Sequence, residues 1–335
     1  MGAGWPRQGR PYNDPVTMST PAPKRELPVW ALFGALILFG AGWGLTLPLA
    51  KIAVMGGYRH FGMIFWQFAI GVAVLSAISL PRGIGLPWER KHLRVYVVIA
   101  LVGTLLPNIG SFEAARHLPA GWMSVVISMV PMIAFPIALI MGNERFNPMR
   151  LLGLAAGLAG VMVLVLPAAG AGSDPPADGR WIWVLVAVLS VSMYGFEGNY
   201  VAKWGTAGLS PVQVLWGASI VGTVLSLPLA LGTGTFINPL PPYGIEDAAL
   251  VISSVFHVVV YTGYVWLVGR AGSVFAAQVA YLVTGFGVMW SMVILGESYG
   301  VGFWIAFVLM ILGITLVRPR AVSVDNSAAA RHPVS

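Results

Sequence analysis

Ten apolar runs, each close to the length of a membrane-spanning helix, follow one another along the chain with short polar connections between them. Such a helix needs about 20 apolar residues. Hydrophobic residues make up 57% of the 335 residues and charged residues only 9%, too few to cover that much apolar surface in water. The sequence therefore predicts an all-α integral membrane protein with ten transmembrane helices. The expected spans are 29–52, 61–80, 93–114, 118–141, 149–167, 181–203, 211–231, 247–268, 272–295 and 300–317.

The residues outside these spans leave room for loops and two tails. Residues 1–28 are polar and rich in Pro and Gly, which predicts a disordered cytoplasmic N-terminal tail, and residues 318–335 form a cytoplasmic C-terminal tail. The chain has no cysteine, which excludes disulfides and thiolate metal sites. We expect no cofactor and no metal site. The net charge of +7 does not indicate nucleic-acid binding, because the basic residues are divided among short loops.

Lysine and arginine fall mostly in the loops that alternating helices place on one side of the membrane. Cytoplasmic loops are enriched in these residues. If the N-terminus lies inside, four of the 19 basic residues fall outside (Lys51, Arg59, Arg116 and Arg180) and the other 15 fall inside. The sequence therefore predicts a multi-pass protein with both termini in the cytoplasm.

Two stretches of the chain repeat each other at a constant offset. Glu144 and Glu297 each precede a glycine by 16 residues, with an offset of 153 between the two. A second, looser similarity relates residues 43–51 to residues 194–203. Each glutamate is expected to anchor the positive N-terminal end of the helix that starts next. The chain is thus predicted to contain two copies of a five-helix unit.

An odd number of helices in each copy has a topological consequence. The second repeat, residues 181–317, must enter the membrane from the side opposite to the first, residues 29–167. Inverted repeats of this kind are found in many secondary transporters, with the substrate near the bilayer midplane at the repeat interface. Alternating access then follows when one half rocks against the other.

Several motifs support a more specific interpretation. The first half contains WGLTLPLAK, EAARHLPAGWMSVVISMVPM and GNERF followed by GLAAGLAGV, and the second half contains GRAGSVFAAQVAYLVTG, LGES and LGI. These segments resemble two copies of an EamA-type repeat, the second weaker, over about residues 30–317. The resemblance implies the drug/metabolite transporter superfamily, and so a ten-helix carrier of the inner (plasma) membrane that exports amino acids or related metabolites. Tyr194 replaces the tryptophan of the first repeat, and Glu197 enters the span.

Glu197 is the costliest polar side chain in the predicted spans, because a carboxylate in lipid must face the bundle interior or water. It is a candidate ligand for a substrate amine or a candidate proton-coupling group, which makes protons a candidate coupling ion. The alternative is a protonated carboxyl bonded to a neighbouring helix. Asn199 lies on a different face of the same helix and is more typical of a helix–helix hydrogen bond.

Other polar and aromatic side chains also fall inside the predicted spans. His257 is a candidate proton switch, and the commoner alternative is a neutral ring bonded between helices. Tyr261 follows it by one helical turn on the same face, so the two are expected to line one cavity. The remaining candidate substrate-binding residues are Trp43, Asn108, Tyr194, Gln278 and Tyr281.

Helix breakers mark candidate hinges. Pro131 and Pro136 lie in the fourth expected span, Gly285 and Gly287 lie in the corresponding part of the ninth, and Pro48 lies in the first. A proline frees a backbone carbonyl and kinks a helix, and breakers at matching depths in both halves point to a transport site. The alternative is a kink without a role in transport.

The predicted function is a secondary transporter that exports amino acids or related small metabolites by alternating access. Its expected partners are the metabolite and membrane lipid, with the chain a monomer or a homodimer. No segment resembles a P-loop, so ATP-driven transport by this chain alone is not indicated. A membrane-embedded enzyme is one alternative, but clustered acids, an HExxH set and a Ser–His pair are not recognised in the sequence. A non-transporting receptor or assembly subunit is the other, and the inverted repeat favours transport over both.

Overall fold

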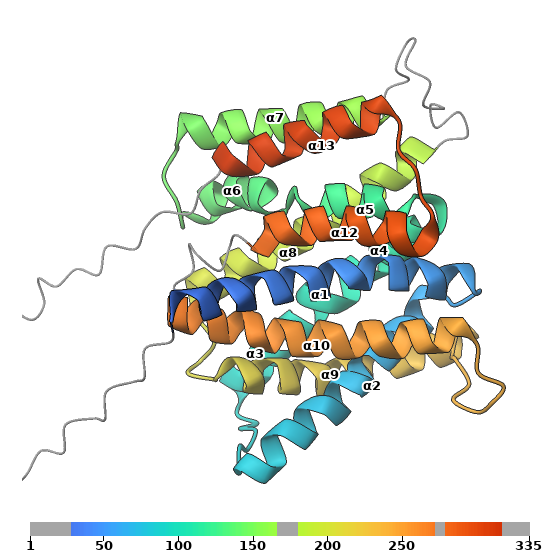
Figure 1. The fold of residues 1–335 in the computed structure, drawn as a ribbon. Helices are drawn as coiled ribbons and strands as arrows, with labels where there is room; N and C mark the ends of the chain where they lie inside the picture. Colours follow the sequence, from blue (N-terminus) through green and yellow to red (C-terminus); the bar gives the residue numbers. More distant parts are fainter. Residues whose placement is uncertain (1–27, 166–179, 272–278, 317–335) are drawn as a thin grey trace, which may run out of the picture.

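The computed structural model of the protein describes residues 28–165, 180–271 and 279–316. Every regular element in these ranges is a helix, and most of the helices run side by side in one bundle (Figure 1). The uninterrupted long helices are α1 (Val29–Met55), α2 (His60–Ser79, followed by the 3₁₀ turn η1 at Leu80–Arg82), α7 (Pro148–Val165), α8 (Arg180–Trp204), α9 (Pro211–Gly232), α10 (Ile245–Ala271), α12 (Val279–Leu295) and α13 (Val301–Leu316).

The third apolar run is one continuous helix with a widened turn inside it. It consists of α3 (Arg90–Ala100), the π-helical turn η2 (Leu101–Leu105) and α4 (Leu106–His117). Pro107 explains the widening, because it has no N–H to give to the carbonyl of Gly103 and its ring clashes with that carbonyl. Single π-turns inside α-helices occur frequently at functional sites.

The fourth run is predicted as one span but is divided in the structure into α5 (Ala120–Ile127) and α6 (Val130–Met141). Pro131 lies in the first turn of α6. Its ring excludes a regular helix through the carbonyl of Ile127, four residues earlier, where α5 ends. The break therefore lies at one of the two candidate hinge prolines of this run, and Pro136 lies inside α6.

Seven helical stretches are long and apolar enough to cross a membrane, and three apolar helices of the described part are shorter. Large apolar side chains such as Leu38, Ile140, Leu189 and Val293 are exposed on the outside of the bundle. Such a surface is suited to lipid, and helices satisfy their own backbone hydrogen bonds there. The chain is thus an all-α, multi-pass membrane protein, as the sequence predicts, and the number of ten spans stays a prediction. The seven stretches are Trp30–Met55, His60–Arg82, Arg90–His117, Ala120–Met141, Trp181–Trp204, Pro211–Gly232 and Ile245–Tyr264, and the shorter three are Leu151–Gly160, Val279–Leu295 and Val301–Gly313.

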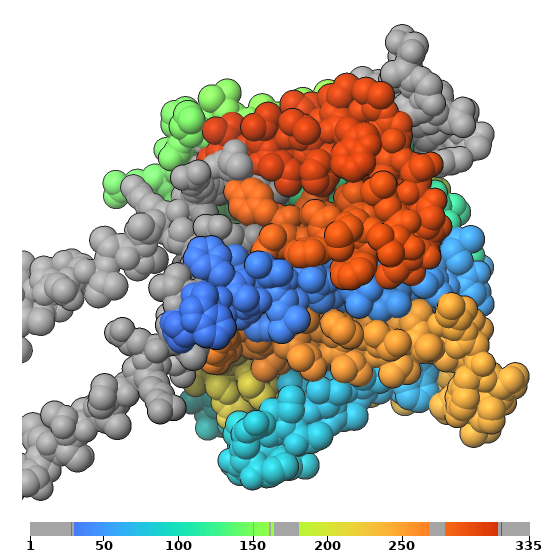
Figure 2. All heavy atoms as spheres, in the orientation of Figure 1, coloured from blue at the N-terminus to red at the C-terminus, as the bar shows by residue number. Residues whose placement is uncertain are grey.

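Helix α1 lies between α10 and α12, as Figure 2 shows on one face of the molecule. Its approach to α12 requires glycine, because a Cβ atom added to Gly44 would lie 2.7 Å from the backbone nitrogen of Gly287. Helix α8 packs against α4 and α6, while α7 packs against α13 and α2 against α9. Helices from the two halves of the chain are therefore packed together throughout the bundle.

The connections between helices gather at the two ends of the bundle. At one end Tyr58, after α1, donates a hydrogen bond to Asp247 at the start of α10. Burial, followed by this bond, raises the pKa of the Tyr58 hydroxyl, which keeps it a donor. At the other end Gln213 of α9 donates to the carbonyl of Gly85 at 2.7 Å. These are called the Tyr58 end and the Gly85 end below.

Candidate functional site

An aromatic group joins the first half of the chain to the second inside the bundle. Trp43 of α1 faces three rings of α10, with centroid distances of 6.5 Å to His257, 5.8 Å to Tyr261 and 5.5 Å to Tyr264. The three α10 residues share a face because they are spaced four and three residues apart. All four side chains are only partly buried although they lie within helices of the bundle. The rings therefore leave part of their surface accessible.

A chain of polar side chains lies across three other helices. Tyr194 of α8 donates to the side-chain oxygen of Asn108 at 3.2 Å. The amide of Asn108, on α4, donates in turn to Gln67 of α2 at 2.7 Å. Asn108 is buried, so these bonds satisfy polar groups that lipid would leave unpaired. They also fix the position of the Tyr194 hydroxyl.

Glu197 lies one turn beyond Tyr194 on α8, against the π-turn η2. A Cβ atom added to Gly103 would lie 2.7 Å from the carboxyl carbon of Glu197 and 2.9 Å from Oε2. The carboxyl thus occupies space that any other residue at position 103 would fill. Tyr194 precedes Glu197 by three residues, so the two side chains lie on one face of α8. The aromatic group, the polar chain and Glu197 with Gly103 are together called the central region below. Among the residues that the structure describes, none forms a hydrogen bond or ion pair with this carboxylate.

The candidate residues of the sequence therefore divide into those that meet and those that do not. Trp43, His257 and Tyr261 lie in the aromatic group, and Asn108 and Tyr194 in the polar chain beside Glu197. For each of them the proposed role in binding stays a prediction.

The other candidate residues make different contacts. Asn199 donates to the carbonyls of Ala134 and Gly195 at 2.9 Å and so ties α8 to α6. Tyr281 packs against the largest buried cluster. Gln278 lies outside the described residues.

The candidate hinges of α1 and α12 show no interruption. Helix α12 passes through Gly285 and Gly287 without a break, and Pro48 is buried inside α1. Gly287 lies at the close contact with α1, whereas a side chain at Gly285 would meet nothing within 4 Å. Motion at these positions stays a prediction.

Two members of the central region were missed from sequence. Gly103 carries no side chain and gives no polar signal, although Pro107 four residues later could have marked it as the site of a distorted turn. Tyr264 follows Tyr261 by three residues on the same helical face, and that spacing could have identified it. The backbone of Gly103 lies next to Glu197, and the ring of Tyr264 lies next to that of Trp43.

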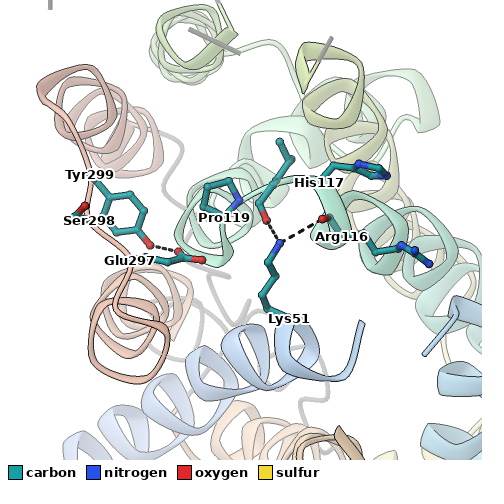
Figure 3. Close-up of a pocket in the computed structure, with 8 residues that line it drawn as sticks. Lys51, Arg116, His117, Pro119, Glu297, Ser298 and Tyr299 are labelled. Atoms are coloured by element: carbon teal, nitrogen blue, oxygen red, sulfur yellow. Dashed lines mark hydrogen bonds between the residues drawn. The ribbon is translucent and has the colours of Figure 1, made fainter. Parts of the chain in front are cut away.

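A separate hollow of about 470 Å³ opens at the Tyr58 end, between α1, the α4–α5 turn and the connection after α12 (Figure 3). Lys51 of α1 donates to the carbonyls of Ala115 at 2.6 Å and Leu118 at 2.9 Å. The side chains of Arg116 and His117 point away from Lys51 in Figure 3. Lys51 follows Trp43 by eight residues, about 12 Å along the helix. The hollow is therefore distinct from the central region.

Glu297 forms the other wall of this hollow. Its carboxylate accepts from the backbone N–H groups of Ala120 at 2.8 Å and Gly121 at 3.1 Å, and from the hydroxyl of Tyr299. Burial, followed by the bond to Glu297, raises the pKa of the Tyr299 hydroxyl, so the phenol remains a donor. Glu297 therefore caps α5, far away in sequence, and the expectation that it anchors the helix starting next is wrong. The Glu297 anion at the N-terminus of α5 and the Lys51 cation at the C-terminus of α4 both interact favourably with the dipole of the helix that they meet.

Replacing Glu297 by Ala is expected to lower the free energy of unfolding by about 1–3 kcal/mol. The change removes a charge-assisted cap and leaves the N–H groups of Ala120 and Gly121 without their acceptor. Thermal unfolding of the purified chain in detergent measures the effect. Glu89→Ala is the control, because the carboxylate of Glu89 is exposed and pairs with only Lys91 among the described residues. Equal melting temperatures of the two variants would contradict the capping role.

The chemical groups of the central region suit a small organic molecule better than a metal ion. In the described ranges no group of three or more His, Cys, Asp or Glu side chains is placed to bind a metal. The region instead offers one carboxylate, several aromatic faces and amide groups. These features are typical of sites that orient a small organic molecule.

Comparison with known proteins gives the family. The sequence profile of the EamA-like transporter family matches residues 29–166 and again residues 181–318. A probable terminal-alkyne amino-acid exporter of Streptantibioticus cattleyicolor is 26% identical over 60% of this chain and 63% of its own length, so this chain spans less than two thirds of that relative. An S-adenosylmethionine/S-adenosylhomocysteine transporter of Chlamydia trachomatis is 23% identical over 82% of this chain and 85% of its own.

A solved crystal structure supports the fold alone. It is 23% identical, covers 85% of this chain and 96% of its own, and superposes with a TM-score of 0.57. The two profile matches together cover well over half of the chain, as the motifs of the sequence predict. The chain therefore belongs to the EamA-like transporter family.

Proposed function

We propose that this protein is a secondary transporter that exports amino acids or related small metabolites by alternating access. The central observation is the carboxylate of Glu197, a residue of the second half that lies against Gly103 of the first half, near the middle of a bundle in which the aromatic group and the polar chain also join the two halves. Trp43 and Asn108 come from the first half, and Tyr194 and Tyr261 from the second. A polar region built from both halves is where a carrier made of two repeats binds its substrate.

The packing of the helices supports two inverted five-helix units. Under the offset of 153, α1 corresponds to α8, α2 to α9, α4 to α10, α12 to the α5–α6 pair, and α7 to α13. Helix α1 packs against α10 and α12, and α8 packs against α4 and α6, which are their counterparts. Helices α2 and α7 each pack against their own counterparts, α9 and α13. A two-fold relation between the halves produces this pattern, with repeats at residues 29–167 and 181–317.

We further propose that the chain lies in the inner (plasma) membrane with the Gly85 end and both termini in the cytoplasm. The absence of cysteine from the sequence allows a direct test. Single cysteines at two exposed positions, Tyr243 and Glu89, lie near opposite ends. In intact cells a membrane-impermeant maleimide is expected to label Tyr243→Cys, and to label Glu89→Cys only after permeabilisation. The reverse pattern would invert the orientation.

The proposed substrate class rests on chemistry that two relatives share. One is named as an amino-acid exporter and the other as an S-adenosylmethionine/S-adenosylhomocysteine transporter. Amino acids and S-adenosylmethionine all carry an α-ammonium group next to a carboxylate. A carrier with a carboxylate and several aromatic faces on its membrane-spanning helices is suited to such molecules.

Transport in proteoliposomes tests the proposal. The purified chain is reconstituted, and the uptake of radiolabelled amino acids, S-adenosylmethionine and nucleosides is followed with and without a pH gradient. At least one solute is expected to enter faster than in liposomes without protein, and a dependence on the gradient would support coupling to protons. Uptake no faster than in empty liposomes for every solute, under both conditions, would remove the carrier function.

A further inference from the structure

Two arginines and two histidines surround one carboxylate at the Tyr58 end of the bundle. Arg59 and His60 lie at the start of α2, while Arg116 and His117 lie with Glu113 in the last turns of α4. The carboxylate of Glu113 is 3.3 Å from Nδ1 of His60, and 3.9 Å from Nη1 of Arg59, Nε of Arg116 and Nε2 of His117. These five residues are called the Glu113 cluster below.

The Glu113 cluster has more hydrogen-bond donors than acceptors. A paired guanidinium and carboxylate normally approach to about 2.7–2.9 Å, so the separations of 3.9 Å are too long for hydrogen bonds. Within the part of the chain that the structure describes, neither guanidinium donates a hydrogen bond, and Nη1 of Arg116 is buried without a partner. Two permanent positive charges also face a single negative one. The cluster is therefore suited to a second anion.

Both guanidiniums can be reached by a bound molecule. The side chain of Arg59 is 51% exposed and that of Arg116 is 26% exposed. The two arginines come from different helices but share Glu113 as a neighbour, which keeps them close together despite their like charge. An oxyanion that binds both would supply the acceptors that Glu113 alone does not.

A stacked pair of rings connects the Glu113 cluster to the apolar surface of α8. The ring of His117 lies 3.9 Å from that of Trp183, at an interplanar angle of 7°. In the same part of α8, Ile182, Leu185 and Leu189 are spaced three and four residues apart, so they share one face, and all three are exposed. This face extends about 10 Å along the helix from the end at which the cluster lies. Hydrocarbon chains can lie against it while a headgroup stays at the cluster.

We propose that the Glu113 cluster binds the phosphate of an anionic phospholipid, with Arg59 and Arg116 as its ligands and the acyl chains along the exposed face of α8. Arginine suits a phosphate because its planar N–H groups bind two oxygens at once. A lipid is the occupant that the position favours, since the cluster lies at one end of a bundle with an apolar outer surface, where headgroups lie. A zwitterionic lipid adds a cation beside its phosphate, and two arginines repel that cation. The inference does not depend on transport.

Three compounds distinguish the sources of the phosphate. Dioleoylphosphatidylglycerol is anionic, dioleoylphosphatidylcholine has the same chains on a zwitterionic headgroup, and inorganic phosphate has no chains. The full chain in detergent, freed of lipid, is titrated with each, and bound molecules are counted by native mass spectrometry. Phosphatidylglycerol is expected to bind saturably and at least about tenfold more tightly than either of the others. Equal affinity for the two lipids, or for inorganic phosphate and phosphatidylglycerol, would overturn the proposal.

A double variant assigns the binding to the two arginines. Arg59→Gln with Arg116→Gln removes both guanidiniums and is expected to weaken phosphatidylglycerol at least about tenfold. Arg90→Gln with Arg94→Gln is the matched control, because it removes two exposed arginines from α3, near the Gly85 end, and is expected to change the affinity less than about threefold. Circular dichroism and size-exclusion chromatography verify that each variant is folded. Unchanged affinity in the folded Arg59/Arg116 variant would exclude the cluster as the lipid site.

Glu113→Gln separates a lipid site from an internal network of ion pairs. In a lipid site the carboxylate repels the phosphate, so its removal is expected to leave phosphatidylglycerol bound at least as tightly as in the unmodified chain. In an internal network the carboxylate organises the arginines, so its removal would scatter them and weaken the lipid as the double arginine variant does. A loss of affinity of about tenfold or more in folded Glu113→Gln protein would therefore contradict the proposal.

Discussion

The substitution Gly103→Val is expected to reduce transport at least about 100-fold while the protein still folds. A Cβ atom at this position would lie 2.7 Å from the carboxyl carbon of Glu197, so the carboxylate must leave its place against the π-turn. The carboxyl is the free end of a flexible side chain, and its displacement costs the fold little. Its loss from the site removes a charge-assisted contact worth about 3 kcal/mol, which corresponds to about 100-fold in affinity.

Initial rates of uptake in proteoliposomes, corrected for the amount of reconstituted protein, measure this effect. Gly198→Val is the matched control, because Gly198 follows Glu197 on α8 and a side chain there meets nothing within 4 Å. We expect near-normal transport for Gly198→Val and similar melting temperatures for both variants. A Gly103→Val protein that keeps more than a third of the normal rate would show that the position of the carboxylate is unimportant.

Sequence alone predicted the helices well because lipid imposes a simple rule on composition. Each apolar run coincides with a helical stretch in the described ranges, since an unpaired backbone is not tolerated in hydrocarbon. The break between α5 and α6 was predicted only as a kink at Pro131. The length over which a proline disrupts a helix depends on neighbouring contacts, and these are not visible in a local pattern.

The candidate site was predicted in part, and the missing part has a physical cause. His257 and Tyr261 are one turn apart, so local periodicity places them on one face, and Trp43 is an aromatic residue inside the first expected span. The hydrogen bond between Asn108 and Tyr194 joins residues 86 positions apart and follows from packing alone. Gly103 matters because of the space that it leaves, which becomes apparent only when Glu197 is seen against it.

The capping role of Glu297 shows the same limit of local reasoning. A glutamate just before a helix is expected to bind the N-terminus of that helix, and sequence offers no other partner. In the folded chain Glu297 instead accepts from the first N–H groups of α5, because the α4–α5 turn packs against the connection that follows α12 (Figure 3). The type of interaction was therefore predictable from the residue, and its partner was not.

The substitution Gly44→Val is expected to prevent normal assembly of the bundle. A Cβ atom at position 44 would lie 2.7 Å from the backbone nitrogen of Gly287 and 3.0 Å from the Cβ of Phe286, so α12 itself would have to move away from α1. Backbone cannot relieve the clash by changing a rotamer, and overpacking of this kind costs about 1–3 kcal/mol or more. Small residues allow membrane helices to approach closely, and a bulky one separates them.

The yield of monodisperse protein and its melting temperature in detergent measure this effect, with Gly34→Val as the control on the same helix. A side chain at Gly34 meets nothing within 4 Å, so the control adds the same β-branched residue to α1 without touching α12. Gly34→Val is expected to behave like the unmodified chain, and Gly44→Val to aggregate or to melt at a clearly lower temperature. Because both variants change helix propensity equally, any difference between them reports the α1–α12 contact alone. Equal yields and melting temperatures would mean that α1 and α12 lie further apart than the structure places them, and the position of Trp43 opposite α10 would then need revision as well.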